Sequence, residues 1–185
     1  ITHHDRRAVR DHHQDAALLA AGEQAIMAAA CQHLIFRTSW VYGARGNNFA
    51  KTMLKLAQER DSLKVVNDQM GAPTGADLLA DVTAHAISIA RQQANVSGLY
   101  HLVASGVTSW HEYATVVIEY ARQAGLPIKV APTAIHAVPS SEFATVAKRP
   151  LNSRLNTSKL QQTFNLYLPD WQTGVTRMLD EYLQK

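Results

Sequence analysis

A short apolar run at residues 34–36, Leu-Ile-Phe, constrains the fold more than any other stretch of this chain. A strand with one face in water alternates apolar and polar side chains, whereas a continuous apolar run is typical of a parallel strand buried on both faces. The run turns polar at residues 37–39, Arg-Thr-Ser. These residues fall at the carboxyl end of the predicted strand, where open α/β sheets place their ligand crevices. The sequence therefore predicts an α/β fold with a binding site close to Arg37.

Helical and strand patterns alternate along the rest of the chain, which also indicates the α/β class. Helical spacing of apolar side chains predicts helices within 16–30, from 49, from 74, from 109, at 157–164 and at 170–183, and short apolar runs predict strands at 63–66, 99–103 and 127–130. Thr74 with Asp77, and Ser109 with Glu112, have the spacing of capping boxes. Residues 132–150 contain three prolines, and we expect a loop there.

Residues 1–20 differ in composition from the remainder, with four histidines, three arginines, three aspartates and no clean period. We therefore divide the chain into an atypical segment, 1–20, and a main part, 21–185. The alanine-rich helix within 16–30 crosses this boundary, and the apolar residues available for one face of it are Leu18, Leu19, Ile26 and Met27. The histidine pairs at 3–4 and 12–13 could chelate a divalent metal ion, although the sequence supplies no second shell for them.

Charge and composition exclude several classes of partner. The net charge is only +3 and no basic block is present, which argues against nucleic-acid binding. No apolar run approaches the roughly 20 residues that span a bilayer, and the start of the chain has no apolar signal core. The single cysteine, Cys31, cannot form an internal disulfide, which fits a reducing compartment. We expect a soluble, cytoplasmic protein with no membrane partner.

Three groups of residues are candidates for ligand contacts. Arg37 could fork two donors onto a phosphate and Trp40 offers a flat face to a sugar or base, unless Arg37 pairs with a carboxylate and Trp40 belongs to the core. A rigid turn with Gln69, Pro73 and Thr74 could hold backbone amides toward a ligand, or could simply connect a loop to a helix. Arg149 follows Lys148, and two adjacent cations could hold a diphosphate or face water.

Other chemistries have weaker candidates. Asp77 and Glu181 lie near predicted helix ends, where each could be a helix cap or a surface charge. If two helices or two subunits brought them together, their carboxylate oxygens would suit magnesium. Cys31 has no activating cation nearby in the sequence, and no G-x-S-x-G elbow exists. A hydrolase therefore has little support.

From about Ala21 to its end the chain resembles the carboxyl-terminal portion of dTDP-4-dehydrorhamnose reductases, a family of extended short-chain dehydrogenases/reductases. The resemblance covers roughly nine tenths of the chain and rests on Gly22-Glu23, Arg37-Thr38-Ser39-Trp40-Val41-Tyr42, Asn48-Phe49, Met53, Asp68-Gln69-x-Gly71-x-Pro73-Thr74, Gly98-x-Tyr100-His101, Arg149-Pro150-x-x-Ser153-x-Leu155 and Leu168-Pro169-Asp170-Trp171. It implies the last elements of a Rossmann-type parallel sheet plus a small mixed α/β substrate-binding domain.

The resemblance also implies an activity and a site. Family members reduce dTDP-4-dehydro-6-deoxy-L-mannose to dTDP-L-rhamnose with NADH or NADPH, in rhamnose and O-antigen precursor synthesis. It implies that Trp40 contacts the deoxysugar nucleotide and that the turn from Gln69 to Thr74 walls the sugar pocket. Some members bind Mg²⁺ between subunits through acidic side chains, and the matching positions here are Asp77 and Glu181. A homodimer is one possible assembly.

The chain departs from the family at the catalytic positions. The family's tyrosine and lysine lie eight and four residues before the glutamate that matches Glu23, and those positions hold Asp15 and Leu19. None of the six tyrosines is followed four residues later by lysine, and no glycine-rich dinucleotide loop is present. We therefore expect a substrate-binding half that is inactive alone. The alternatives are a non-catalytic sugar-nucleotide-binding or regulatory module, and a remnant that associates with itself through exposed apolar surface.

Overall fold

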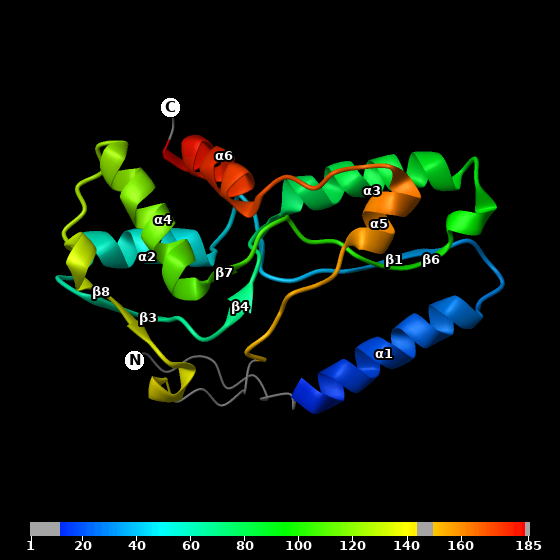
Figure 1. Cartoon of the computed structure of the whole chain (residues 1–185), viewed down its shortest axis with the longest axis horizontal. Helices are drawn as coiled ribbons and strands as arrows, with labels where there is room; N and C mark the ends of the chain where they lie inside the picture. The colour runs from blue at the N-terminus through cyan, green and yellow to red at the C-terminus, as the bar shows by residue number, and fades with distance from the viewer. Residues whose placement is uncertain (1–11, 144–149, 184–185) are drawn as a thin grey trace.

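The computed structural model describes residues 12–143 and 150–183, in which helices and short strands alternate as the sequence predicts (Figure 1). The helices are α1 (His12–Ala28), α2 (Phe49–Glu59), α3 (Ala76–Ala90), α4 (Trp110–Gln123), α5 (Ser158–Phe164) and α6 (Trp171–Leu183). The strands are β1 (Leu34–Arg37), β2 (Val41–Tyr42), β3 (Leu63–Val66), β4 (Met70–Gly71), β5 (Thr74–Gly75), β6 (Gly98–His101), β7 (Thr108–Ser109) and β8 (Ile135–Val138). Three 3₁₀ turns occupy Ala94–Val96, Pro132–Ala134 and Ser140–Glu142.

The first lobe consists of β1, β6, α3 and α5. Strands β1 and β6 run parallel, with Leu34 opposite Gly98. The core of this lobe lies between β6 and the two helices, and Leu160 and Phe164 of α5 are fully buried in it. Burying a leucine or phenylalanine side chain contributes about 1.5–3 kcal/mol. The parallel pairing confirms the prediction for residues 34–36, but these side chains are only half-buried, so the expected burial on both faces is wrong for the described residues.

The second lobe consists of β3, β8, α2 and α4, with α6 packed against α4 (Figure 1). Strands β3 and β8 run parallel, with Leu63 opposite Ile135. The buried side chains of the lobe come from all of these elements, and Leu54, Val117 and Leu179 are among the least exposed. Helices α2 and α4 thus cover the β3–β8 pair from one side.

Two predictions about strands are wrong. Residues 127–130 form no strand, because the backbone N–H groups of Lys129 and Val130 both donate to the carbonyl of Ala57, at 2.9 and 3.0 Å, and fix the segment to the end of α2. The partner of β3 is instead β8, which lies inside the region expected to be a loop. The prolines at 132 and 139 bracket this strand and do not interrupt it.

Helix caps follow the prediction at one of two positions. Ser109 caps α4, since its Oγ accepts a hydrogen bond from the N–H of Glu112 at 3.1 Å. The Glu112 carboxylate instead accepts from the Thr108 hydroxyl at 2.9 Å, so only the Ser109 half of the predicted capping box is confirmed. The Thr74–Asp77 capping box is wrong: α3 begins after Gly75 without a side-chain cap, and the N–H of Thr74 donates to the carbonyl of Trp40 at 3.1 Å. Because β5 pairs with β2, the N–H of Thr74 is used in strand pairing and is not available to the Asp77 side chain.

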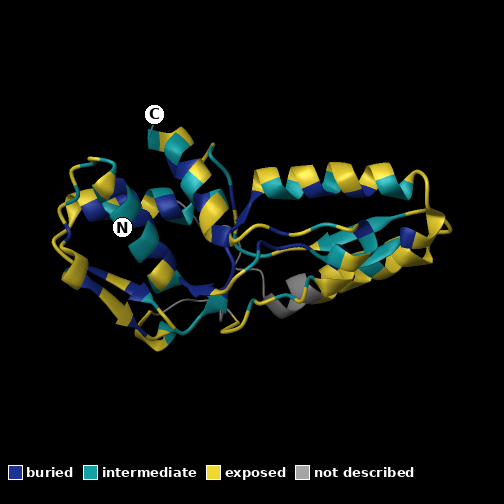
Figure 2. Ribbon diagram, turned by 45° about the horizontal axis from the view of Figure 1, so that its top comes forward, coloured by how far each residue is buried: buried dark blue, intermediate teal, exposed yellow. Residues whose placement is uncertain are grey.

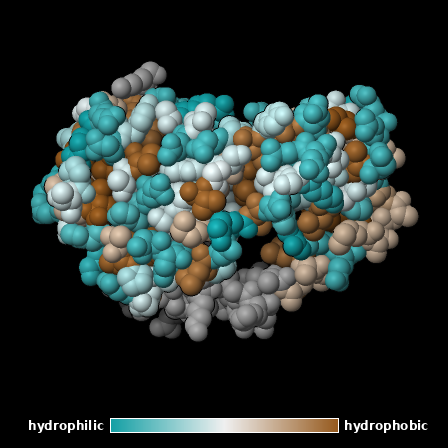
Figure 3. Space-filling view, in the orientation of Figure 1, coloured by the Kyte–Doolittle hydropathy of each residue, from teal (hydrophilic) through white to brown (hydrophobic). Residues whose placement is uncertain are grey.

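Helix α1 forms as predicted, but its apolar side chains do not pack against a core. Leu18 is 66% exposed and Leu19 is 71% exposed. Figure 2 shows exposed residues along most of this helix, and the region of α1 at the lower right of Figure 3 is weakly hydrophobic at its surface. None of the helices described is long and apolar enough to cross a membrane.

Candidate functional site

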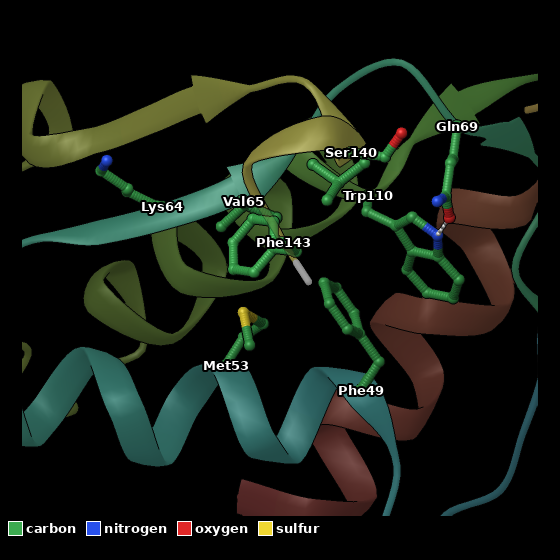
Figure 4. Close-up of a pocket in the computed structure, with 9 residues that line it drawn as sticks. Phe49, Met53, Lys64, Val65, Gln69, Trp110, Ser140 and Phe143 are labelled. Atoms are coloured by element: carbon green, nitrogen blue, oxygen red, sulfur yellow. Dashed lines mark hydrogen bonds between the residues drawn. The ribbon is translucent and has the colours of Figure 1, made fainter. Parts of the chain in front are cut away.

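An open cavity of about 380 Å³ lies in the second lobe between α2, α4 and the β3–β8 pair (Figure 4). Its walls are mostly apolar, with a few polar groups at the margin, which is the usual composition of a small-molecule site. The lining residues are Phe49, Met53, Lys64, Val65, Val66, Gln69, Trp110, Ser140 and Phe143. We call this the main cavity.

Two helix caps place the aromatic walls of the main cavity. Asn48 begins α2, because its Oδ1 accepts from the N–H of Lys51 at 3.0 Å while its Nδ2 donates to the carbonyl of Gly43 at 2.8 Å. The first residue of that helix is Phe49. Ser109 begins α4 in the same way, and the first residue of α4 is Trp110. Capping therefore fixes where both rings leave the backbone.

A carboxylate holds the third wall in place. The Asp68 side chain accepts from the backbone N–H of Ser140, at 3.0 Å to each oxygen, and from the Ser140 hydroxyl at 2.9 Å. Lys64 adds an exposed ion pair to Glu142 at 3.1 Å. These contacts join the loop after β3 to the turn after β8. The wall that carries Ser140 and Phe143 is therefore fixed before any ligand arrives.

Trp110 links the main cavity to Trp40. Its Nε1–H donates to Oε1 of Gln69 at 3.2 Å, the bond drawn in Figure 4. Its ring stacks on Trp40 with centroids 3.7 Å apart and planes 15° apart, and Phe49 leans on it at 4.6 Å. Behind Trp110 and Phe49 lies a second cavity of about 360 Å³, which Trp40 also lines. The aromatic rings form the partition between the two spaces.

Trp40 has an unusual backbone. Its φ of 51° lies in the left-handed region, which large side chains rarely adopt. Such conformations persist where the surroundings over-determine them, and they concentrate at functional sites. Here the carbonyl of Trp40 accepts from Thr74 and its ring is stacked on Trp110. Trp40 thus sits at the joint between β1 and β2 with both its backbone and its ring fixed.

Arg37 lies at the carboxyl end of β1, away from both cavities. Its Nε and Nη2 donate to the two carboxylate oxygens of Glu23 at 2.8 and 2.5 Å. This hydrogen bonding lowers the pKa of Glu23 and raises the pKa of Arg37. The structure shows the carboxylate pairing that the sequence left open as the alternative to a phosphate contact. A ligand contact by Arg37 stays a prediction.

The turn after β3 contributes one side chain to the main cavity and supports it with the others. Gln69 lines the cavity. Pro73 is buried, and the fully buried Thr74 hydroxyl donates to the carbonyl of Ala72 at 3.1 Å and accepts from the N–H of Ala104 at 3.2 Å. Arg149 and Lys148 lie outside the described residues. Of the predicted ligand contacts, the structure brings Gln69 and Trp40 together through Trp110.

The predicted metal ligands are not arranged as a metal site. The Asp77 carboxylate pairs with Arg177 and also accepts from the N–H of Leu78 at 2.8 Å. Glu181 is exposed on α6. Within residues 12–143 and 150–183, no three His, Cys, Asp or Glu side chains come together in a way that could hold a metal ion. Asp77 and Glu181 therefore form no Mg²⁺ site within the described part of one chain, and a site shared between subunits stays a prediction.

Sequence reasoning missed several lining residues. Trp110 was visible only as the residue after a helix cap, and Phe49 and Met53 as members of a helix face and of the family resemblance, without a role in binding. Ser140 and Phe143 lie in the region expected to be a loop. Tyr42 and Tyr113 line the second cavity, and burial raises the pKa of Tyr42 to about 12 and also raises the pKa of Tyr113. In two places, Asn48-Phe49 and Ser109-Trp110, a helix-capping residue is followed directly by an aromatic residue, and this repeated pattern could have predicted the aromatic wall.

Comparison with known proteins places these features in a family. Residues 16–184 match the model of the RmlD substrate binding domain. The chain belongs to this family. It is 62% identical over 161 residues to the dTDP-4-dehydrorhamnose reductase of Escherichia coli K12, covering 87% of this chain and 53% of that protein.

Solved structures agree with the assignment. The dTDP-4-dehydrorhamnose reductase of Bacillus anthracis in complex with NADP is 34% identical, with a TM-score of 0.73 over 89% of this chain and 54% of that one. The orthologue from Clostridium acetobutylicum is 31% identical, with a TM-score of 0.77 over 100% of this chain and 60% of that one. The chain spans about half the length of the curated relatives it matches. The predicted family and the α/β class with Rossmann-type relatives are confirmed.

Proposed function

We propose that this RmlD substrate-binding domain binds the dTDP-sugar of a reaction that converts dTDP-4-dehydro-6-deoxy-L-mannose to dTDP-L-rhamnose. The main cavity is the observation that carries the proposal. Phe49, Trp110 and Phe143 line the cavity and supply aromatic surface for a flat pyrimidine, and Gln69 supplies a polar group beside them. Aromatic stacking with a base is worth roughly 1–3 kcal/mol.

The reductant in this proposal is NADPH or NADH. The Bacillus anthracis relative was solved with NADP. The present sequence has no glycine-rich loop for the pyrophosphate, so its residues do not fit the dinucleotide and we assign it no contact in this chain. The role proposed for this chain is to hold the sugar nucleotide.

We place this step in the cytoplasm, within rhamnose, O-antigen and hence lipopolysaccharide precursor synthesis. The exposed thiol of Cys31 fits a reducing compartment. The division at residue 21 and a homodimer are further parts of the proposal. Sedimentation velocity at increasing protein concentration tests the dimer.

Calorimetric titration with dTDP and dTDP-L-rhamnose tests the binding proposal. Phe143→Ala removes an exposed ring from the cavity wall and should weaken dTDP binding about tenfold, the effect of losing one base–aromatic contact. Tyr167→Ala is the matched control, because Tyr167 is 95% exposed and lines neither cavity. Absence of binding by the unaltered chain, or equal effects of the two substitutions, would contradict the proposal.

A non-catalytic binding or regulatory module is the second candidate. It is favoured by one observation, the Asp15 and Leu19 found where the family has its tyrosine and lysine. Such a module would bind dTDP-L-rhamnose and co-purify with a partner enzyme. Retention of the ligand without any partner would favour the first proposal.

A further inference from the structure

The indole ring of Trp40 is covered on both faces. Trp110 stacks on one face at 3.7 Å between centroids. On the other, a Cβ at position 71 would lie 2.6 Å from Cε2, 2.9 Å from Cζ2 and 3.0 Å from Cδ2 of Trp40. Cε2 is bonded to both Cζ2 and Cδ2 and is the nearest of the three atoms to this Cβ position. The Cβ position therefore lies above the plane of the ring, and the Gly71 backbone faces the flat side of the indole.

The backbone conformation of Gly71 does not itself require glycine. Gly71 pairs with Thr108 in the β4–β7 ladder and is not among the glycines with positive φ. A Cβ closer than 3.0 Å to ring carbons, in contrast, forces something to move. The ring of Trp40 cannot yield toward Trp110, which is held by Gln69 and Phe49. The reason for glycine at this position is therefore the neighbouring indole.

The position of Trp40 between Trp110 and the Gly71 backbone determines which part of its ring can contact a ligand. With both faces covered, the ring presents only its edge, and its Nε1–H donates no hydrogen bond to any residue in the described part of the chain. The sequence-based expectation was a flat face for a sugar or base. An indole edge with an unused donor is suited to a polar oxygen of a ligand instead.

We propose that Gly71 is a positioning residue for Trp40: its missing Cβ lets the indole lie between the Gly71 backbone and Trp110, with its edge and Nε1–H presented to the sugar of the bound nucleotide. The part that concerns the sugar rests on the proposed function. The part that concerns the position of the ring does not. Gly71 touches no ligand in this account and acts only through Trp40.

Circular dichroism tests the position of the ring directly, because two stacked indoles couple and give a paired far-ultraviolet band. The unaltered chain should show this band. Gly71→Ala should abolish it, whereas Gly22→Ala should keep it, since a Cβ at Gly22 meets no atom within 4 Å. Persistence of the band in Gly71→Ala would overturn the proposal.

A second measurement covers the case in which Gly71→Ala is too unstable for spectroscopy. Thermal unfolding is compared for Gly71→Ala in the presence of Trp40 and in a Trp40→Ala background. The substitution should lower Tm with Trp40 present and have little effect without it, because the clash then has no partner. An equal loss of Tm in both backgrounds would overturn the proposal.

Ligand binding tests the sugar contact. The gain in affinity from dTDP to dTDP-L-rhamnose should be lost in Gly71→Ala and kept in Gly22→Ala. Retention of the gain in Gly71→Ala would overturn the sugar contact. If the unaltered chain binds neither nucleotide, the proposed function fails, and the dichroism and unfolding measurements still decide the role of Gly71.

Discussion

Thr74 is a residue whose buried hydroxyl has two partners inside the protein. It donates to the carbonyl of Ala72 and accepts from the N–H of Ala104. Thr74→Val should cost about 1–3 kcal/mol in the free energy of unfolding, because the Ala104 N–H is left buried without an acceptor. Thr74→Ser, which keeps the hydroxyl, should cost less. Urea denaturation measures both, and a loss of dTDP binding by Thr74→Val without loss of stability would show a ligand contact instead.

Removing the hydroxyl should have opposite effects on stability at two buried tyrosines. The Tyr100 hydroxyl donates to the carbonyl of Val96 at 2.6 Å, whereas the Tyr113 hydroxyl has no partner among the described residues. Tyr100→Phe should lower the free energy of unfolding by about 1 kcal/mol, the usual net value of a hydrogen bond. Tyr113→Phe should be neutral or stabilising, because it removes a desolvated polar atom. Parallel urea curves compare the two, and a larger loss for Tyr113→Phe would contradict the prediction.

The raised pKa of buried Tyr42 predicts that the folded protein loses stability in alkali. Burial raises its pKa from 10.0 to about 12 in the folded state, so the folded protein holds this proton more tightly than the unfolded chain. Stability is therefore fully present below pH 10 and falls as pH rises from about 10 toward about 12. Denaturant unfolding at pH 9 and above 10 measures the decline. Tyr42→Phe should make the decline shallower without abolishing it, since burial also raises the pKa of Tyr113. An unchanged slope would contradict this assignment.

Single residues show how far sequence reasoning reaches into the site. Gln69 and Trp40 were both identified and are now joined through Trp110. Their connection was not predictable, because Trp40, Gln69 and Trp110 are far apart in the sequence and are brought together only by the tertiary fold. Arg37 illustrates the reverse case. Its alternatives, a phosphate or a carboxylate, could not be separated until the structure placed Glu23 beside it.

At the scale of elements, the Asp68 contact to the turn after β8 shapes the main cavity. Asp68→Ala removes all the hydrogen bonds that Ser140 donates to this carboxylate. We expect the Ser140–Phe143 wall to loosen and dTDP affinity to fall by about tenfold, since ordering a wall during binding costs on the order of 1 kcal/mol per side chain. Calorimetric titration measures the change. Asp61→Ala is the control, because Asp61 makes only an exposed pair with Lys129, and equal effects of the two would refute the role of Asp68.

Most elements were predictable, and the exceptions have physical causes. Strands β1, β3 and β6 were predictable because each is a short, mostly apolar stretch, although β3 contains Lys64 and β6 ends at His101. Strand β8 is not predictable from its sequence, Ile-His-Ala-Val, because the prolines at 132 and 139 on either side of it favour a loop. The predicted capping box at Thr74 does not form, because the N–H of Thr74 donates to the carbonyl of Trp40 in the pairing of β5 with β2. In each exception a tertiary contact outweighed a local pattern.

The whole molecule predicts binding without turnover. Residues 15 and 19 lie in α1, and they are aspartate and leucine, neither of which can donate a proton to the ketone as a lysine-activated tyrosine does. This chain alone should give no measurable NADPH oxidation with dTDP-4-dehydro-6-deoxy-L-mannose, while still binding dTDP-L-rhamnose. Absorbance assays with the Escherichia coli relative as positive control test this. Turnover well above background would contradict it.

Each sheet in the described part of the chain has only two strands, so β1 and β6 each have one edge without a strand partner. The outer edge of β6 is blunted, because Lys159 donates to the carbonyl of Leu99 at 2.8 Å. No comparable contact covers the outer edge of β1 in the described residues. Unpaired backbone groups along such a strand act as a template for another chain. The same two-stranded arrangement that leaves one edge of β1 without a partner therefore makes β1 the place where concentrated preparations of this protein would begin to aggregate, and Ile35→Lys is the substitution with which to prevent it.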